Sequence, residues 1–185
     1  SPTGSLDDIT TLEYLNISGT KVSVDISKQT NLKTFICSNT SLSSLDLSSN
    51  LGLETLHCDH TSISNLDLSK HTQLTTLKCN DTQLNSLNVG NCSLLKELVC
   101  NSNPNLETLN VSGLTNIEAM NMNANTDRLR EINALGSNKV VVDTIKLWFR
   151  ENEITSPLGM LYVTDPDKYI REYAENAGWE VHETL

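Results

Sequence analysis

Apolar residues recur along most of the chain with a period of about 21 positions. Four consecutive segments begin at Leu32, Leu53, Leu74 and Leu95, and the first of them is LKTFICSNTSLSSLDLSSNLG. The first three segments carry apolar residues at positions 1, 4, 6, 11, 14 and 16, and the fourth, which is one residue longer, has the last three of these shifted by one. A shorter copy covers 12–31 and a looser one follows from 117 to about 136. The chain therefore contains six tandem copies of one unit.

The spacing inside the unit predicts short strands. Positions 4 and 6 alternate with polar residues, as in a half-buried strand, and positions 14 and 16 repeat this alternation. A unit with two short extended pieces and no helical stripe cannot bury its own apolar face. The copies must therefore stack on one another, which predicts a solenoid with one continuous core.

A different pattern begins after residue 138. We predict a strand at 140–142, a short helix capped by Asp143, a strand at 161–163, a helix begun by Asp165 and Pro166, and a final strand at 179–181. Trp148 and Trp179 are expected in the core of this part. The predicted organisation is a partial N-terminal cap at 1–11, six repeats at 12–138 and a small α/β C-terminal capping unit at 139–185. Because Leu6 and Ile9 cover the first repeat only partly, a further domain or further repeats are expected before Ser1.

The repeat resembles the leucine-rich repeat, whose signature is L-x-x-L-x-L-x-x-N-x-L. The "LDLS" half-repeat and the 21-residue period are similar to bacterial surface proteins of the internalin type. This resemblance implies a right-handed solenoid, mostly β with short turns. It also implies an exported protein, extracellular or at the cell surface, that adheres to proteins or carbohydrates.

Charge and composition restrict the partners. The 185 residues include 13 basic and 23 acidic side chains, for a formal net charge of -10. A surface this acidic repels phosphate, so nucleic acid is not an expected partner. No apolar run approaches the length of a transmembrane helix, so no membrane insertion is predicted within this chain.

Two columns of equivalent residues have mainly structural interpretations. Four cysteines stand at position 6, namely Cys37, Cys58, Cys79 and Cys100. Side chains on adjacent parallel strands point the same way, so we expect free, buried thiols that act as small apolar residues, with a metal or redox role as the alternative. Cys92 lies outside this column and is expected to be partly exposed.

The Thr or Asn at position 9, such as Thr40 and Asn103, is expected to bond backbone groups of neighbouring repeats at a turn. A second polar column contains Asp25, Asp46 and Asp67, followed by Asn in later copies. It faces outward. We expect a solvated ladder there, with calcium binding as the alternative.

The candidate recognition surface is the concave face of the first strands, where positions 3, 5 and 7 point outward. Six strands about 4.8 Å apart would make a face of about 30 Å, which suits a protein or glycan better than a deep pocket. Ile36 and Val99 are expected as exposed aliphatic residues. The candidate binding residues are Tyr14, Ile36, His57, Asp59, His60, Lys78, Asn80 and Val99.

The same residues offer a less favoured alternative. His57, Asp59 and His60 contain the ligand types of a zinc site, but no catalytic or phosphate-binding motif accompanies them. We therefore predict no enzyme, no cofactor and no metal. The predicted function is a non-catalytic binding module of an exported bacterial protein. The alternative is a structural spacer that displays another domain and has no ligand of its own.

Overall fold

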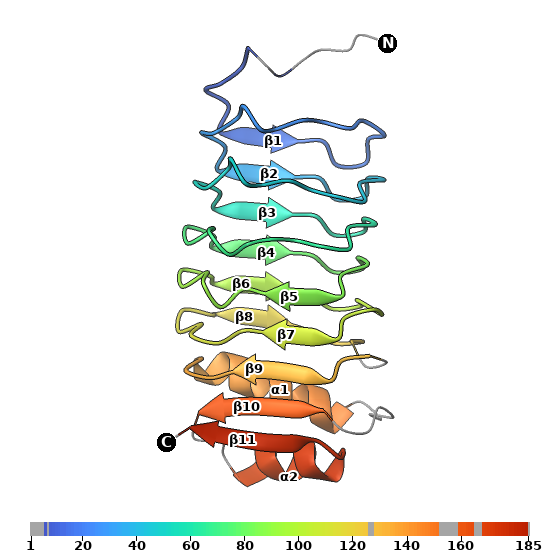
Figure 1. Ribbon diagram of the computed structural model, residues 1–185, viewed down its shortest axis with the longest axis vertical. Coiled ribbons are helices and arrows are strands. Elements are labelled where there is room, and N and C mark those ends of the chain that lie inside the picture. Colours follow the sequence, from blue (N-terminus) through green and yellow to red (C-terminus); the bar gives the residue numbers. More distant parts are fainter. Residues whose placement is uncertain (1–5, 7, 126–127, 152–158, 165–167, 185) are drawn as a thin grey trace.

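The first halves of the six repeats build one parallel sheet, sheet A. A computed structural model describes residues 6, 8–125, 128–151, 159–164 and 168–184. The strands of sheet A, in spatial order, are β1 (Tyr14–Asn16), β2 (Thr34–Ile36), β3 (Thr55–His57), β4 (Thr76–Lys78), β6 (Glu97–Val99) and β8 (Ala119–Asn121). Neighbouring strands pair without a register shift, so equivalent repeat positions lie beside one another (Figure 1).

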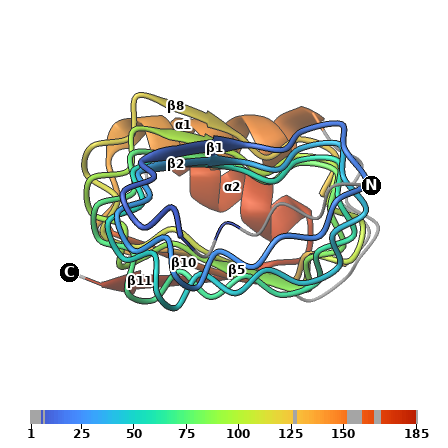
Figure 2. The ribbon, with the colours of Figure 1, turned by 90° about the horizontal axis from the view of Figure 1, so that it is seen from above.

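A second parallel sheet, sheet B, lies on the opposite side of the core. Its strands, in spatial order, are β5 (Ser86–Asn88), β7 (Thr108–Asn110), β9 (Glu131–Ala134), β10 (Met160–Thr164) and β11 (Glu180–Thr184). Figure 2 looks along the stack and shows the two layers, with β1 and β2 on one side and β5, β10 and β11 on the other. The chain therefore forms the leucine-rich repeat solenoid that its apolar pattern predicts.

The core contains the predicted inward positions. In the second repeat, Leu32, Phe35 and Cys37 are fully buried, and the equivalent residues of the next three repeats are buried as well. Each strand of three residues holds one core side chain at its centre, flanked by two residues that face outward. Burial therefore comes from stacking, since no repeat encloses its own apolar residues.

Every first strand ends in the same left-handed turn at position 8. In this column φ is 57° at Asn39, 53° at His60 and 70° at Gly19. The turn allows the position 8 amide to reach the next repeat, as where the Asn39 N–H donates to the Asp59 carbonyl at 3.0 Å. The backbone accepts a conformation that L residues seldom adopt, because the bond joins two repeats.

The Thr and Asn residues at position 9 form different bonds. The Thr40 and Thr61 hydroxyls each donate to a carbonyl three residues earlier, Cys37 and Cys58, at 2.7 Å. The longer Asn103 side chain donates to the Cys100 carbonyl of its own repeat and to the Cys79 carbonyl of the preceding one. The expected bond to a neighbouring repeat is thus made by Asn, whereas these Thr residues stabilise their own turn.

The cysteine column consists of free, buried thiols, as predicted. Burial raises the pKa of Cys37 and Cys100 to about 12, and that of Cys58 and Cys79 well above the ordinary 9.0. Neutral thiols that resist ionisation are poor nucleophiles and poor metal ligands. The expected partial exposure of Cys92 is wrong, because its side chain is fully buried where one repeat turns into the next.

The second halves of the repeats form strands only from the fourth repeat onward. The earlier segments lack strands, although they contain the same apolar positions. In both regions the Asp or Asn side chain accepts a hydrogen bond from the N–H of the residue two places later. The Ser48 N–H donates to Asp46 at 2.9 Å, and the Ser112 N–H donates to Asn110 at 3.0 Å. The column therefore closes a local turn, which agrees with the expected solvated ladder.

The C-terminal part differs from the prediction at its start. The segment 140–142 is not a strand but lies in helix α1 (Lys139–Glu151). Valines favour strands, but the Asn138 side chain caps the helix by accepting the Val141 N–H. Val141, Ile145, Trp148 and Phe149 then fall on one buried face.

The strands of the C-terminal part prolong sheet B. β10 pairs in parallel with β9 on one side and with β11 on the other. The strands predicted at 161–163 and 179–181 are thus present, at 160–164 and 180–184. Helix α2 (Lys168–Asn176) connects them, and α1 and α2 lie on the inner side of this extension (Figures 1 and 2). The predicted helix start at Asp165 and Pro166 falls outside the described residues.

An aromatic cluster fills this end of the core. Trp148, Phe149 and Trp179 pack edge to face, with ring centroids 5.0 to 5.7 Å apart. Both Trp side chains are buried, as expected. Gly159 lies so close to the Trp179 ring that any side chain there would collide with it. Neither described helix has the length and apolar character needed to cross a membrane.

Candidate recognition surface

The outer face of sheet A carries three columns of side chains, one from each outward position. Because the strands pair in register, each side chain lies beside its counterparts in the two neighbouring repeats. The column at position 5 consists of Asn16, Ile36, His57, Lys78, Val99 and Asn121. Unlike the core columns, it differs in chemistry at almost every step. These variable residues are the part of the repeat that stacking does not determine.

The centre of this face is more covered than the sequence suggests. Tyr14 at its edge is 55% exposed, whereas Ile36 and Val99 nearer the centre are less exposed and half-buried. The expectation that these two are exposed aliphatic residues is therefore wrong. Each lies between two neighbouring strands, and the register places Ile36 beside His57 and Val99 beside Lys78.

The charged residues of the face are paired. The Lys78 ammonium lies 3.0 Å from a Glu97 carboxylate oxygen, and both side chains are about one-third exposed. The Ser38 hydroxyl donates to the Asp59 carboxylate at 2.7 Å. Burial lowers the pKa of His57, and the positive charge of Lys78 lowers it further. The face thus presents a neutral imidazole beside a lysine–glutamate pair.

His60 and Asn80 differ in their positions. His60 occupies the left-handed turn after β3, and its Nδ1 lies 2.7 Å from a carboxylate oxygen of Asp81 in the next repeat. Both side chains of this pair are exposed. Asn80 is half-buried in the outward column beside Asp59. The structure thus places His57, Asp59, Lys78 and Asn80 on one face and His60 at its rim.

Two acidic partners, Glu97 and Asp81, were not among the sequence candidates. Glu97 is one strand away from Lys78 and two positions earlier in its repeat, and Asp81 occupies the same turn position as His60. The period places the members of each pair on adjacent repeats, but it does not show that their side chains meet.

The arrangement does not resemble a metal centre. In the described part of the chain, no three His, Cys, Asp or Glu side chains are grouped so that they could hold a metal ion. His60 turns to Asp81, and Cys58 points into the core. The chemistry available on this face is hydrogen bonding and ion pairing across a broad surface.

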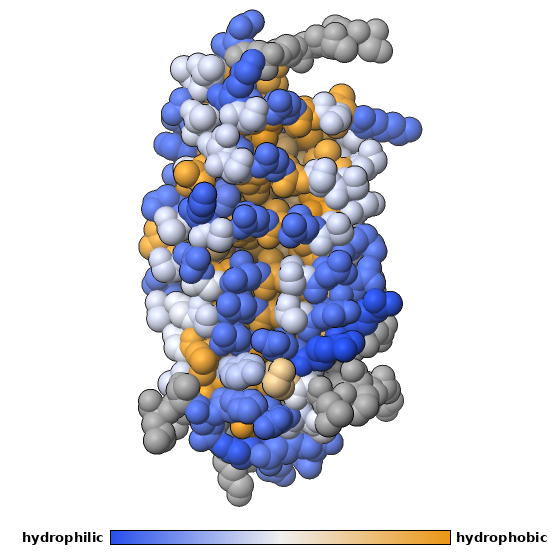
Figure 3. Space-filling view, in the orientation of Figure 1, coloured by the Kyte–Doolittle hydropathy of each residue, from blue (hydrophilic) through white to orange (hydrophobic). Residues whose placement is uncertain are grey.

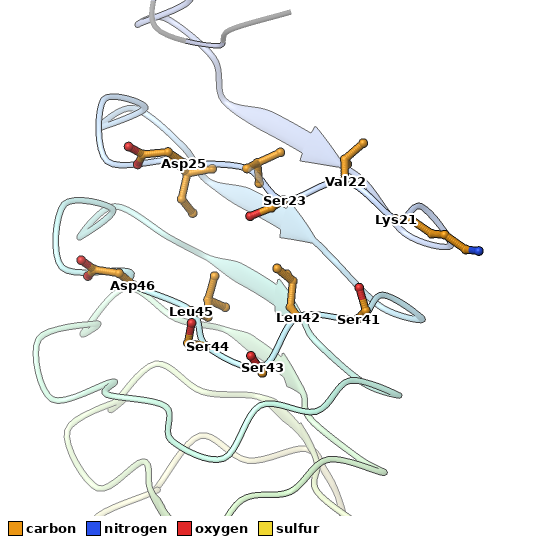
Figure 4. Close-up of a pocket in the computed structure, with 12 residues that line it drawn as sticks. Lys21, Val22, Ser23, Asp25, Ser41, Leu42, Ser43, Ser44, Leu45 and Asp46 are labelled. Carbon is orange, nitrogen blue, oxygen red and sulfur yellow. The ribbon is translucent and has the colours of Figure 1, made fainter. Parts of the chain in front are cut away.

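A cavity that the repeat pattern does not predict lies on the opposite side of the solenoid. It has a volume of about 390 Å³ and lies between the second halves of the first two repeats, where sheet B has not begun. Figure 4 shows Val22, Leu42 and Leu45 around it, with Asp25 and Asp46 at one end. Apolar surface gathers over this N-terminal half, whereas hydrophilic side chains predominate over the C-terminal part (Figure 3).

Comparisons with known proteins agree on the fold. No family model matches the sequence, and no curated protein matches it. The functional domain of InlJ from Listeria monocytogenes is 23% identical over 88% of this chain, with a TM-score of 0.50. Internalin C2 from Listeria monocytogenes is 15% identical over 96% of this chain and 83% of its own, with a TM-score of 0.53. This chain has the leucine-rich repeat fold of the internalins.

The likeness extends to one feature of the core. The InlJ domain includes a cysteine ladder, and the stacked cysteines at position 6 form such a column here. This chain covers 41% of the InlJ domain, which is less than half its length. At these identities the likeness establishes the architecture, an internalin-like solenoid with a small α/β element.

Proposed function

We propose that this chain is a non-catalytic binding module that recognises a protein or a glycan through the outer face of sheet A. The internalin-like repeat fold supports a protein-binding role. Strands of six repeats, about 4.8 Å apart, give a broad surface, which suits a macromolecule better than a small ligand. By the same resemblance the module acts outside the cell or at its surface, and residues 139–185 cap the last repeat.

One observation carries the proposal. The Leu and Cys side chains are buried in the core, and the Thr and Asn side chains form hydrogen bonds inside and between repeats. These columns are therefore not available to a partner. His57, Asp59, Lys78 and Glu97 instead break the repeat at the centre of the face, and all four remain partly exposed. Residues that stacking does not require, gathered on one surface, are the ones able to encode a partner.

A second candidate function rests on the pairing of these charges. Lys78 is neutralised by Glu97, and Asp59 accepts a bond from Ser38. Surface pairs of this kind contribute about 0 to 1 kcal/mol to stability and do not themselves require a ligand. A spacer that displays another domain would show the same internal neutralisation. The two functions differ in whether the isolated face binds.

The test compares one triple variant with a matched control. Ile36→Ser, His57→Ala and Lys78→Ala together remove the central column, and we expect the fold to persist because all three side chains point outward. The control changes exposed residues elsewhere, Lys70 and Thr72, to Ala. Both variants and the wild type are applied to a glycan array and to an array of purified extracellular proteins.

Binding by the wild type and the control, with at least a tenfold loss in the triple variant, is the expected result. Circular dichroism and melting temperature establish that the triple variant is folded. No binding by any variant would favour the spacer. Equal binding by all three would move the recognition site away from sheet A.

A further inference from the structure

The segment before the first repeat has the backbone of a repeat's last turn. The Ile9 N–H donates to the Leu6 carbonyl at 2.9 Å, and the Leu12 N–H donates to the Ile9 carbonyl at 3.4 Å. The same two bonds close every later repeat as far as the fourth. In the second repeat they run from Asn50 to Leu47 and from Leu53 to Asn50. Leu6 therefore stands at repeat position 16.

Side-chain bonds confirm this alignment. The Gln29 amide donates to the Leu6 carbonyl at 2.7 Å. One repeat later, the Asn50 amide donates to the Ile26 carbonyl at 3.0 Å. The first repeat thus bonds to Leu6 in the same way as the second repeat bonds to the end of the first. The sequence prediction of a partial cap at 1–11 assigned no repeat register to this segment.

In the described part of the chain, β1 has a strand partner on one side only. In each later repeat the position 2 amide donates to the preceding repeat, as from Lys33 to the Glu13 carbonyl at 2.8 Å. The position 5 carbonyl accepts from the preceding repeat, as Ile36 does from Ile17. Among the described residues, the Glu13 amide and the Asn16 carbonyl have no such backbone partner. The free side of β1 therefore presents unpaired backbone donors and acceptors, as at the edge of a parallel sheet.

Apolar side chains at the same end lack cover. Leu12 and Leu15 are half-buried, whereas their equivalents in the second repeat, Leu32 and Phe35, are fully buried. Ile9 is 45% exposed. Backbone donors, backbone acceptors and apolar surface are therefore all left open at one end, in the positions that a preceding repeat would cover.

We propose that this end is a docking surface for one further leucine-rich repeat. Its strand pairs in parallel with β1, and apolar residues at its positions 4 and 6 cover Leu12 and Leu15. The alignment decides between this occupant and a second copy of the chain. Leu6, Ile9 and Leu12 already form the bonds of the last turn of such a repeat, so the strand that fits must join Leu6 covalently. A second copy would meet that turn instead of an empty edge.

The first measurement uses the chain as it is. Amide hydrogen exchange should be fast at Glu13 and Tyr14, on the open side of β1. Exchange should be at least about tenfold slower at Lys33 and Thr34, which are the equivalent amides in the second repeat and are bonded to Glu13. The chain should be monomeric. A dimer with protected Glu13 and Tyr14 amides would assign the edge to a second copy and overturn the proposal.

The second measurement supplies the occupant. Residues 53–67, which are positions 1 to 15 of the third repeat, are fused directly to Leu6 in place of residues 1–5. A control fusion exchanges Leu56 with His57 and Cys58 with Asp59, which turns the apolar side chains outward at constant composition. We expect the matched fusion alone to raise the melting temperature by about 5 °C or more and to protect the Glu13 amide. Equal effects of both fusions, or none, would refute the docking surface.

Discussion

The buried cysteine column makes stability depend on alkaline pH. Burial raises the pKa of Cys58 and Cys79 well above the ordinary 9.0. In the unfolded chain these thiols regain their ordinary pKa and release protons first as the pH rises. The unfolded state then binds fewer protons than the folded state, so the free energy of unfolding must fall. The stabilisation is complete below about pH 9 and is lost above it.

The size of the effect follows from the same numbers. Each pH unit above the unfolded-state pKa costs about 1.4 kcal/mol per thiol, provided that the folded thiol stays neutral. Between pH 7 and pH 10, one fully buried cysteine therefore removes about 1.4 kcal/mol of stability. Cys58→Ala deletes that contribution and adds a small cavity cost that does not vary with pH. The variant should lose about 1.4 kcal/mol less than the wild type over this interval.

Urea unfolding at pH 7, 8, 9 and 10, with a reducing agent present, measures the difference. The control is Leu56→Ala, which empties a fully buried position of the same repeat without removing a titratable group. Its free energy of unfolding should be lower than that of the wild type at every pH, and it should decrease with pH as steeply as that of the wild type. If Cys58→Ala also runs parallel to the wild type, the thiol ionises equally in the folded and unfolded states, and its inferred burial is refuted.

Three further variants test other columns. Asn103→Ala should cost about 2 kcal/mol in urea unfolding, because it strands buried carbonyls that this side chain bonds in two repeats. His71→Asn should make stability less sensitive to acid between pH 7 and 5. Burial lowers the pKa of His71, so stability is lost as the pH falls below about 6.5, and the equivalent Asn50 carries no such charge. Replacing Asp46 and Asp67 by Asn should extend sheet B toward the N-terminus, seen as slower amide exchange at 43–47; unchanged exchange would contradict this.

The reason for the last expectation lies in the Asp column. Sheet B is formed where the column holds Asn and is missing where it holds Asp. Asp25 lies close enough to Asp46 to oppose the ionisation of that carboxyl, although the hydrogen bond from the Ser48 amide lowers its pKa overall. Like charges on adjacent strands weaken their pairing, and Asn removes the repulsion while it keeps the turn bond.

The features that stacking of the repeats determines could be predicted from the sequence. Period and alternation predicted the strands of sheet A, the buried thiols and the leucine-rich repeat solenoid, because a one-dimensional core repeats the same requirement in every copy. The prediction was wrong where a residue's surroundings are unique. Val140 is helical because Asn138 caps α1, and Cys92 is buried because the junction of two repeats encloses it. Neither surrounding is visible in a periodic pattern.

The candidate surface could be predicted in position but not in chemistry. The outward column through Ile36, His57 and Lys78 follows from alternation alone. The partial burial of Ile36 and the pairing of Lys78 with Glu97 depend on the distance between adjacent strands and on rotamers. The pattern therefore placed these residues on the outer face of sheet A, but it predicted too much exposed apolar surface there.

The pairing on this face sets a condition on any partner. A ligand that takes one member of the Lys78–Glu97 pair leaves the other without its counterion, and it avoids this cost if it supplies charges of both signs or disturbs neither residue. A purely anionic ligand would have to displace Glu97 and approach a chain with a net charge of -10. A mixed-charge protein surface, or a neutral glycan that bonds to His57 and Asn80, satisfies the condition. The electrostatics of sheet A therefore favour these two classes of ligand over a purely anionic one.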